Sequence, residues 1–419
     1  MRNGRTLRTL AALCALGLVL TACGGRGGEG GAGGASPGIT DTEVTLGGSY
    51  PLSGPASAYS TIAASTQACF NKVNAQGGVR MGDGKTRQIK FTVYDDGYQP
   101  ARTLENARRL VEQDQVFALF DTLGTAPNTA ILDFVKENQV PHIFLATGAS
   151  KFGAHPDQMP WTIGWQPAYS LESAVYAEYL KRQKPGATVA VLYQNDDFGK
   201  DYLDGFKRAI AGSNVRIVAE ESYQVTDPSV DSQVLNLSRS GANVFFDVTT
   251  PKFAAQAITR KAESGWAAEH LLNSVSTSVG SVLQPAGFPA SQQIISAEYI
   301  KDPSDPRIQQ DPAMAAYKRD AAQYGDFDAN DEYGVFGFAV CDTMVKTLQK
   351  TPQPTRQALM DTVRNLDLDN PLLSDGIRVK TGPDDGFPVE SMRLQRFVGE
   401  RWEPFGEVIG FEGRTPVER

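Results

Sequence analysis

The stretch Val189-Ala-Val-Leu-Tyr193 predicts a short buried strand, because it is an apolar run rich in β-branched residues. Helical spacing follows near residues 200–211, and Val215-Arg-Ile-Val-Ala219 predicts the next strand. A strand–helix–strand unit of this length implies a right-handed crossover between parallel strands, with helices covering both faces of the sheet. Residues 189–219 therefore predict an α/β fold.

The same alternation extends in both directions from this unit. Strand-like and helical segments follow one another over residues 44–145 and again from about 170 to 295. From about 305 the chain turns helical once more, and we expect these late helices to return to the first half. We predict two doubly wound parallel-sheet lobes joined by a hinge, with a ligand cleft at the carboxyl ends of the strands. The predicted lobes are 39–161 plus 300–390 and 162–299 plus 391–419.

Composition excludes several classes of protein. The chain has 419 residues, 41% hydrophobic and 21% charged, which is typical of a globular protein and not of a disordered chain. It carries 40 Lys and Arg against 48 Asp and Glu, a net charge of −8, without a dense basic run. Because nucleic-acid binding needs a basic face, we expect no nucleic-acid partner. The 3 His and 4 Cys supply metal clusters poorly, and we expect no metal and no cofactor.

The N-terminus has the pattern of an export signal. Three Arg precede an apolar run over residues 10–20, which is shorter than the roughly 20 residues that span a bilayer. Leu20-Thr21-Ala22-Cys23 resembles a bacterial lipobox, which implies cleavage before Cys23 and a lipid on its thiol. The following tether, residues 23–38, contains nine Gly. We expect a signal peptide at 1–22 and an extracytoplasmic protein held on the cell membrane through this lipid alone; the alternative is an ordinary signal peptide.

Four short motifs carry a resemblance to a known family. They are Pro51-Leu-Ser-Gly-Pro-Ala-Ser-Ala-Tyr59, Asn74-Ala-Gln-Gly-Gly78, Tyr94-Asp-Asp96 with the helix from Ala101 to Val111, and Tyr193-Gln-Asn-Asp-Asp-Phe-Gly199. In this order and spacing they resemble the type I periplasmic binding proteins of the leucine/isoleucine/valine group, which serve ABC importers. The resemblance covers nearly the whole chain after the signal. It implies a receptor that closes two lobes over a small ligand.

The resemblance places part of the ligand site on the first lobe. Tyr59 would cover the ligand from above. In the family, the loop that matches Leu123-Gly124-Thr125 supplies a hydroxyl and backbone contacts to a carboxylate. The loop that matches Ala146-Thr147-Gly148 supplies a carbonyl and a hydroxyl, the latter being either Thr147 or Ser150. Capping of the following helices accounts for the same Ser and Thr pattern.

Residues of the hinge and the second lobe complete the predicted site. Phe198 matches an aromatic wall of the family, and Tyr333 matches another aromatic position at the start of a late helix. Trp165 and Gln166 lie at the first crossing between the lobes, where we expect them to face the cleft. Thr249 stands at a position where the family has Tyr.

The Glu that pairs with an α-ammonium group in the family is missing. Val275 stands near its position, in a stretch without acids. An unpaired ammonium group in a closed cleft is very costly. Either Glu172 or Asp247 replaces the missing charge, or the ligand lacks an amine. We expect a branched-chain amino acid or a related small amphiphile, with an aromatic or aliphatic carboxylate or an amide as the alternative.

Sequence patterns for catalysis and for metal binding are absent. The chain has neither Gly-x-Ser-x-Gly nor His-Glu-x-x-His, and we expect no enzymatic activity. Residues 326–331 begin like a calcium loop but lack its sixth and twelfth residues, so we expect a solvated acidic loop. Cys69 and Cys341 lie at similar depth on their predicted helices, and they form either a disulfide or two buried thiols.

The resemblance also predicts the partners. We expect a monomer that delivers its ligand to ABC permease and ATPase subunits. A ligand-sensing receptor for a signalling partner is the second hypothesis, because such receptors use the same fold.

Overall fold

The computed structural model describes residues 35–417, which belong to one compact unit. The predicted signal peptide and Cys23 lie outside the described residues, so their roles stay predictions. Within the described part, no helix has the length and apolar character that crossing a membrane requires.

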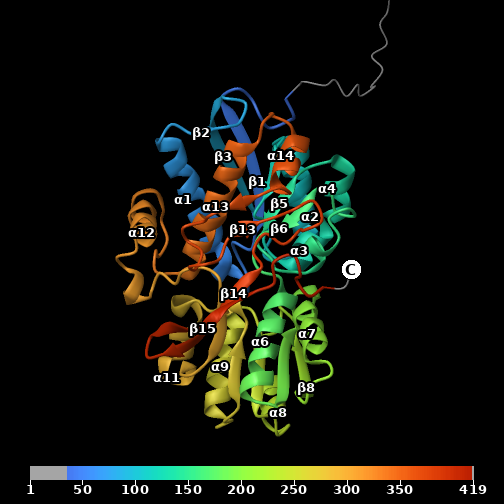
Figure 1. Ribbon diagram of the computed structural model, residues 1–419, viewed down its shortest axis with the longest axis vertical. Helices are drawn as coiled ribbons and strands as arrows, with labels where there is room; N and C mark the ends of the chain where they lie inside the picture. Colours follow the sequence, from blue (N-terminus) through green and yellow to red (C-terminus); the bar gives the residue numbers. More distant parts are fainter. Residues whose placement is uncertain (1–34, 418–419) are drawn as a thin grey trace, which may run out of the picture. The chain divides into compact units, whose positions relative to one another are not determined.

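Six strands form the sheet of the first lobe (Figure 1). β1 lies at its centre and pairs in parallel with β3 and β4, and the parallel pairing continues through β5 to β6. β2 is antiparallel to β3, to which a tight turn connects it. The strands, in sheet order, are β2 (Val79–Arg80), β3 (Thr86–Asp95), β1 (Glu43–Tyr50), β4 (Ala118–Phe120), β5 (His142–Leu145) and β6 (Thr162–Gly164).

Helices from both ends of the chain complete the first lobe. The early ones are α1 (Ser60–Ala75), α2 (Pro100–Arg108), α3 (Thr125–Ala130), α4 (Leu132–Asn138) and α5 (Lys151–Ala154). The late ones are α12 (Pro312–Tyr324), α13 (Glu332–Lys350) and α14 (Arg356–Val363). α13 packs along α1, and a disulfide between Cys69 and Cys341 joins the two helices. The close approach depends on Gly337, because a Cβ there would lie 2.7 Å from the Ile62 carbonyl oxygen.

Seven strands form the sheet of the second lobe. Five of them are parallel, and β14 and β15 add an antiparallel pair at one edge. The strands, in sheet order, are β15 (Arg401–Gly410), β14 (Ser391–Val398), β11 (Ile295–Glu298), β10 (Glu269–Leu272), β9 (Val244–Val248), β7 (Thr188–Gln194) and β8 (Arg216–Tyr223). The helices are α6 (Tyr169–Gln183), α7 (Asp197–Ile210), α8 (Asp231–Ser238), α9 (Pro251–Glu263), α10 (Gln284–Ala286) and α11 (Phe288–Ser291).

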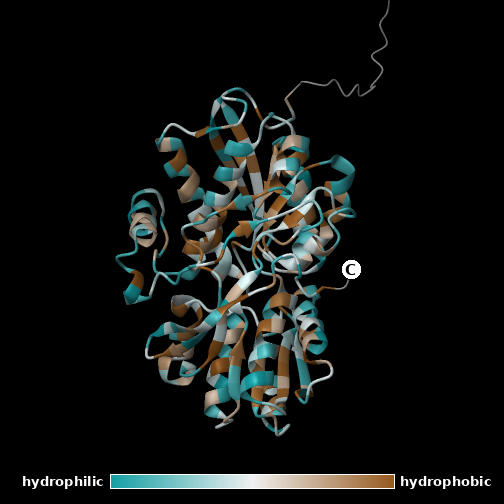
Figure 2. Ribbon diagram, in the orientation of Figure 1, coloured by the Kyte–Doolittle hydropathy of each residue, from teal (hydrophilic) through white to brown (hydrophobic). Residues whose placement is uncertain are grey.

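Three segments connect the lobes. The chain leaves the first sheet after β6, returns after β11 to build α12 to α14, and crosses again before β14. A small antiparallel pair, β12 (Asp367–Leu368) and β13 (Val379–Lys380), precedes the last crossing. Hydrophobic residues run along the strands of both sheets, while the outward helix faces are hydrophilic (Figure 2). The predicted fold class, two doubly wound α/β lobes joined by a hinge, is confirmed.

Candidate functional site

Loops at the carboxyl ends of the first sheet form one side of the site. Parallel strands bring these ends to the same edge. Leu123 follows β4 and forms a β-bridge with Ala146, which follows β5. Gly124 adopts a φ of +99°, and a Cβ there would lie 2.6 Å from the ring of Tyr98. Glycine at this position therefore lets the Tyr98 ring reach the cleft.

The second lobe supplies the opposite side. Val275 lies in a short 3-10 turn, Ser274–Ser276, that follows β10. Phe198 lies in the first turn of α7, where the Asp196 side chain accepts hydrogen bonds from the backbone N–H groups of Phe198 and Gly199 at 3.0 and 3.3 Å. This N-cap fixes the entry of the helix and thereby the place of the Phe198 ring.

A cavity between the lobes is lined by residues of both. The volume open to the centres of water-sized molecules is about 50 Å³. Seven aromatic side chains face it, and no Lys, Arg or His is among its described lining residues. The lining consists of Tyr59, Ile62, Tyr98, Leu123, Gly124, Thr125, Ala146, Gln166, Tyr169, Phe198, Thr250, Ser274, Val275, Tyr299, Ile300, Glu332, Tyr333 and Phe336.

Two tyrosines of the first lobe hold one carbonyl group of the second lobe. The hydroxyl groups of Tyr59 and Tyr333 donate hydrogen bonds to the Val275 carbonyl oxygen at 3.1 and 2.9 Å. The two rings pack edge to face with their centroids 5.1 Å apart. Both side chains are buried. These hydrogen bonds exist only while the lobes are together, so the structure represents a closed cleft.

Further hydrogen bonds connect the lobes around the cavity. Asp331, the N-cap of α13, accepts from the hydroxyls of Ser278 and Ser281, each at 3.0 Å. On the other side, Asp201 accepts from the backbone N–H and the hydroxyl of Ser150 at 2.8 and 2.9 Å. Asp331 belongs to the stretch for which we expected a solvated loop; it is instead 7% exposed, because both of its carboxylate oxygens are used across the lobe boundary.

The description of a known family fits this architecture. The model of the periplasmic binding protein family matches residues 43–401. The chain belongs to this family. The predicted resemblance is thereby confirmed. Periplasmic binding proteins bind solutes, and the family does not consist of enzymes.

Relatives within the periplasmic binding protein family are distant. A Leu/Ile/Val-binding protein homolog 3 from Brucella melitensis is 25% identical over 206 residues, which cover 49% of this chain and 54% of the relative. A Leu/Ile/Val-binding protein homolog 7 from Brucella suis is 22% identical over 62% of this chain and 65% of the relative. The matches thus span between about half and two thirds of these relatives.

Solved structures of periplasmic binding proteins share the fold. A branched-chain amino acid ABC transporter protein from Thermus thermophilus, with bound valine, superposes with a TM-score of 0.79 and 16% identity over 89% of this chain and 97% of that chain. A fatty acid ABC transporter substrate-binding protein from Thermomonospora curvata superposes with a TM-score of 0.76 and 19% identity over 92% of this chain and 96% of that chain. At these identities the likeness shows the fold alone.

The structure brings most of the predicted site residues to the cavity of this periplasmic binding protein. Those in the lining are Tyr59, Leu123, Gly124, Thr125, Ala146, Gln166, Phe198, Val275 and Tyr333. Those outside the lining are Thr147, Gly148, Trp165 and Thr249. That the lining residues bind a ligand stays a proposal.

Packing explains why Trp165, Thr249 and Thr147 do not line the cavity. The Trp165 indole donates a hydrogen bond to the Thr343 hydroxyl at 3.1 Å and is fully buried behind the cavity wall. Thr249 donates to Asp247 at 2.6 Å, and the next residue of the chain lines the cavity instead. Thr147 lies one layer back, with its hydroxyl 2.7 Å from that of Thr125.

Gly148 is displaced from the cavity by a neighbouring ring. A Cβ on Gly148 would lie 2.8 Å from the ring of Tyr169, which itself lines the cavity. Glycine is therefore needed for packing at this position.

Sequence reasoning did not find half of the lining. These residues are Ile62, Tyr98, Tyr169, Thr250, Ser274, Tyr299, Ile300, Glu332 and Phe336. Several of them directly neighbour a predicted residue in the chain, as Thr250 neighbours Thr249 and Glu332 neighbours Tyr333. That adjacency is the signal that could have found them.

The acids proposed from the sequence do not line the cavity. Glu172 is 1% exposed and accepts hydrogen bonds from Tyr176, Tyr202 and Ser274. Burial raises the pKa of the Glu172 carboxyl, and these hydrogen bonds oppose the rise. Asp247 is fully buried beside Thr249 and His270, and burial raises its pKa to about 8. Among the described lining residues, the acidic one is Glu332.

Proposed function

We propose that this protein is the extracytoplasmic solute-binding component of an ABC importer, which closes two lobes over one small, mainly apolar molecule and delivers it to the permease and ATPase subunits. The observation that carries this proposal is the cavity between the lobes, lined from both sides and walled by seven aromatic side chains. Because the hydrogen bonds at its rim form only on closure, a ligand held by both lobes shifts the protein toward the closed state.

The size of the cavity limits the ligand. Its volume for the centres of water-sized molecules is about 50 Å³, which favours a small ligand. The names of the Brucella relatives and the valine in the Thermus thermophilus structure support a branched-chain ligand of this size.

Ligand-dependent closure tests the proposal. The purified protein is screened by thermal shift against branched-chain amino acids, small amines, alcohols, amides and carboxylates, and each hit is followed by small-angle X-ray scattering. A ligand that raises Tm is expected to leave the scattering profile matching the closed form, while the free protein contains open molecules. Chemical turnover of any compound in the screen, or identical profiles with every hit, would contradict the proposal.

The proposal includes the membrane anchor. Cys23 is the expected lipid attachment site, and the protein is expected to act as a monomer. Membrane fractions of cells that express the full chain should contain the protein, and a Cys23→Ala variant should leave them. Recovery of both forms in the same fraction would contradict lipid anchoring.

A further inference from the structure

One acidic residue is among the described lining of the cavity. Glu332 is the first residue of α13, and its Oε2 lies 2.7 Å from the hydroxyl of Thr277 in the second lobe, whose single proton is shared with the Ser274 carbonyl oxygen at 2.8 Å. No other Asp or Glu is among the described lining residues, and neither is a Lys, Arg or His. The cavity therefore carries one acidic group and no basic group to balance it.

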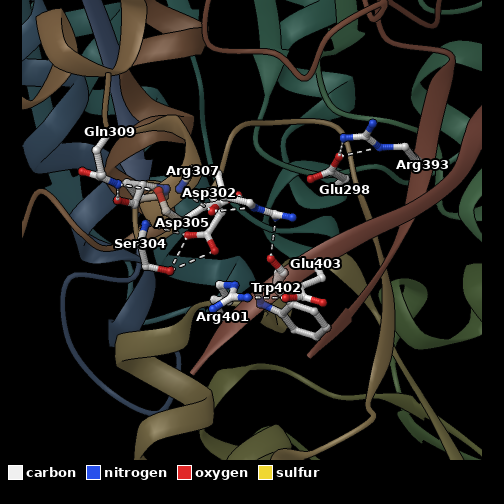
Figure 3. Close-up of polar contacts among 11 residues, drawn as sticks. Glu298, Asp302, Ser304, Asp305, Arg307, Gln309, Arg393, Arg401, Trp402 and Glu403 are labelled. Carbon is white, nitrogen blue, oxygen red and sulfur yellow. Dashed lines mark hydrogen bonds and ion pairs between the residues drawn. The ribbon is translucent and has the colours of Figure 1, made fainter. Parts of the chain in front are cut away.

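The surroundings of Glu332 are acidic as well. Glu298, Asp302 and Asp331 each act on it electrostatically. Glu298 is paired with Arg393 at 2.5 Å, whereas the Asp302 carboxylate accepts hydrogen bonds from the backbone N–H and the hydroxyl of Ser304 and forms no ion pair in the described part of the chain (Figure 3). The acidic field around Glu332 is therefore only partly neutralised.

This environment makes an isolated carboxylate costly. Burial raises the pKa of Glu332 well above its ordinary value, and Asp302, Asp331 and Glu298 raise it further, while the hydrogen bond from Thr277 lowers it. A bound anion would add repulsion to the ionised carboxylate, and a neutral ligand would leave the carboxyl protonated. A bound cation would stabilise the ionised carboxylate.

The walls of the cavity also suit a cation. Seven aromatic rings line it, and the negative faces of aromatic rings attract ammonium groups. The rings of Tyr169 and Phe198, from α6 and α7 of the second lobe, are 5.3 Å apart by their centroids. Rings also pack favourably against the alkyl groups of a ligand, so the same walls accommodate both parts of an alkylammonium ion.

We propose that the cleft selects a small alkylammonium ion, with Glu332 as the counter-charge and the aromatic rings as its walls. This inference rests on the proposed solute-binding function and names the class of its ligand. It replaces the expectation, drawn from the missing Glu at Val275, that the ligand lacks an amine, because the acid comes from the other lobe. It also disfavours a free carboxylate as the ligand.

Three compounds with one carbon skeleton test the charge. 3-Methylbutan-1-amine, 3-methylbutan-1-ol and 3-methylbutanoate present a cation, a neutral group and an anion on the same branched chain, and leucine adds the zwitterion. Isothermal titration of the purified protein at pH 7.5 gives the four affinities. We expect the amine to bind about 10- to 100-fold more tightly than the alcohol, with the carboxylate weakest.

A pair of acid-to-amide variants assigns the charge to one residue. Glu332→Gln should remove the preference for the amine over the alcohol, whereas Asp326→Asn, at an exposed position outside the cavity, should leave it unchanged. An equal loss in both variants would show that the general acidity of the protein is responsible, and would overturn the assignment. Circular dichroism and Tm establish that both variants fold.

The pH dependence of the wild type provides a readout that needs no variant. Binding of a cation favours ionised Glu332, so the affinity for the amine should increase from pH 5 to pH 8, while that for the alcohol should not. The neighbouring Tyr59, Tyr299 and Tyr333 have raised pKa values and stay neutral in this range. Burial also raises the pKa values of Glu298, Asp302 and Asp331, whose ionisation acts in the same direction, so the profile of Glu332→Gln is measured beside that of the wild type. Flat profiles for both compounds would overturn the role of Glu332.

The outcomes separate this inference from the proposed function. If leucine, the alcohol or the carboxylate binds more tightly than the amine and the lobes close, the inference that the ligand is a cation is refuted. The proposed solute-binding function then still holds. No change in Tm or in scattering with any of the four compounds would overturn the alkylammonium ligand, and the same result across the wider screen would overturn the proposed function as well.

Discussion

The two tyrosine hydroxyls on the Val275 carbonyl allow the energy of lobe closure to be tested directly. In Tyr59→Phe and Tyr333→Phe each ring stays and one hydrogen bond, of 3.1 or 2.9 Å, is lost. Both bonds join the first lobe to the second, so their loss destabilises the closed state and not the open one. The expected result is weaker ligand binding without a loss of folding stability.

The magnitude depends on whether the carbonyl keeps a donor. A single variant leaves the Val275 oxygen with the other tyrosine, which should cost about 0.5–1.5 kcal/mol and raise Kd about 2- to 13-fold. The double variant leaves the oxygen without a donor and should cost about 1–3 kcal/mol beyond the first loss, a further 5- to 150-fold. We therefore expect the double variant to exceed the sum of the single ones.

A matched control is available in the same lobe. The Tyr317 hydroxyl is buried and has no hydrogen-bond partner among the described residues. Tyr317→Phe should therefore leave affinity unchanged. Kd is measured by calorimetry with the compound that raises Tm most in the wild type, and closure is followed by small-angle scattering.

The reasoning on closure would be refuted by a simple outcome. If the Tyr59→Phe, Tyr333→Phe double variant binds as tightly as Tyr317→Phe, the two hydrogen bonds contribute nothing to closure. An additive double variant would show instead that the two tyrosines act independently on Val275.

Three further predictions concern stability. Gly124→Ala should lower the free energy of unfolding by about 1–3 kcal/mol in urea, because its φ is +99° and the new Cβ would meet the Tyr98 ring at 2.6 Å; an unchanged midpoint would contradict this close packing. Replacing Cys69 and Cys341 together by Ser should cost about 2–5 kcal/mol, measured in the same way, and an equal stability of the two forms would argue against a disulfide in the native protein. Burial raises the pKa of Asp201 to about 6 from 3.8, so between these values the folded protein holds a proton that the unfolded chain releases. The wild type should therefore lose stability relative to Asp201→Asn as the pH rises from 4 to 6. A constant difference in Tm over this range would contradict the shift.

The local sequence pattern was sufficient to predict the fold but not the edge strand of the second sheet. The strand–helix rhythm predicted the central strands of both sheets, since parallel buried strands are continuous apolar runs. β15 was not predicted, because Pro404 and Gly406 interrupt its sequence. An edge strand tolerates such residues, as it needs hydrogen bonds on one side only. Its position at the edge follows from the tertiary structure and not from the residues themselves.

The site was predictable where it follows the ends of strands and helices. The resemblance to the family placed the loops of Leu123 and Ala146 and the helix starts of Phe198 and Tyr333 in the site. Glu332 was not considered, because the search for an acid followed the second-lobe loop, and nothing in the sequence states that α13 faces that loop across the cleft. Packing between distant segments of the chain decides which of two adjacent residues faces the cavity.

The Cys69–Cys341 bond has a consequence for how the protein responds to force. It closes a sequence separation of 272 residues that contains the entire parallel part of the second sheet. A pull applied through the two termini would bypass this enclosed length, so roughly 900–1,000 Å of contour stays hidden until the bond is reduced.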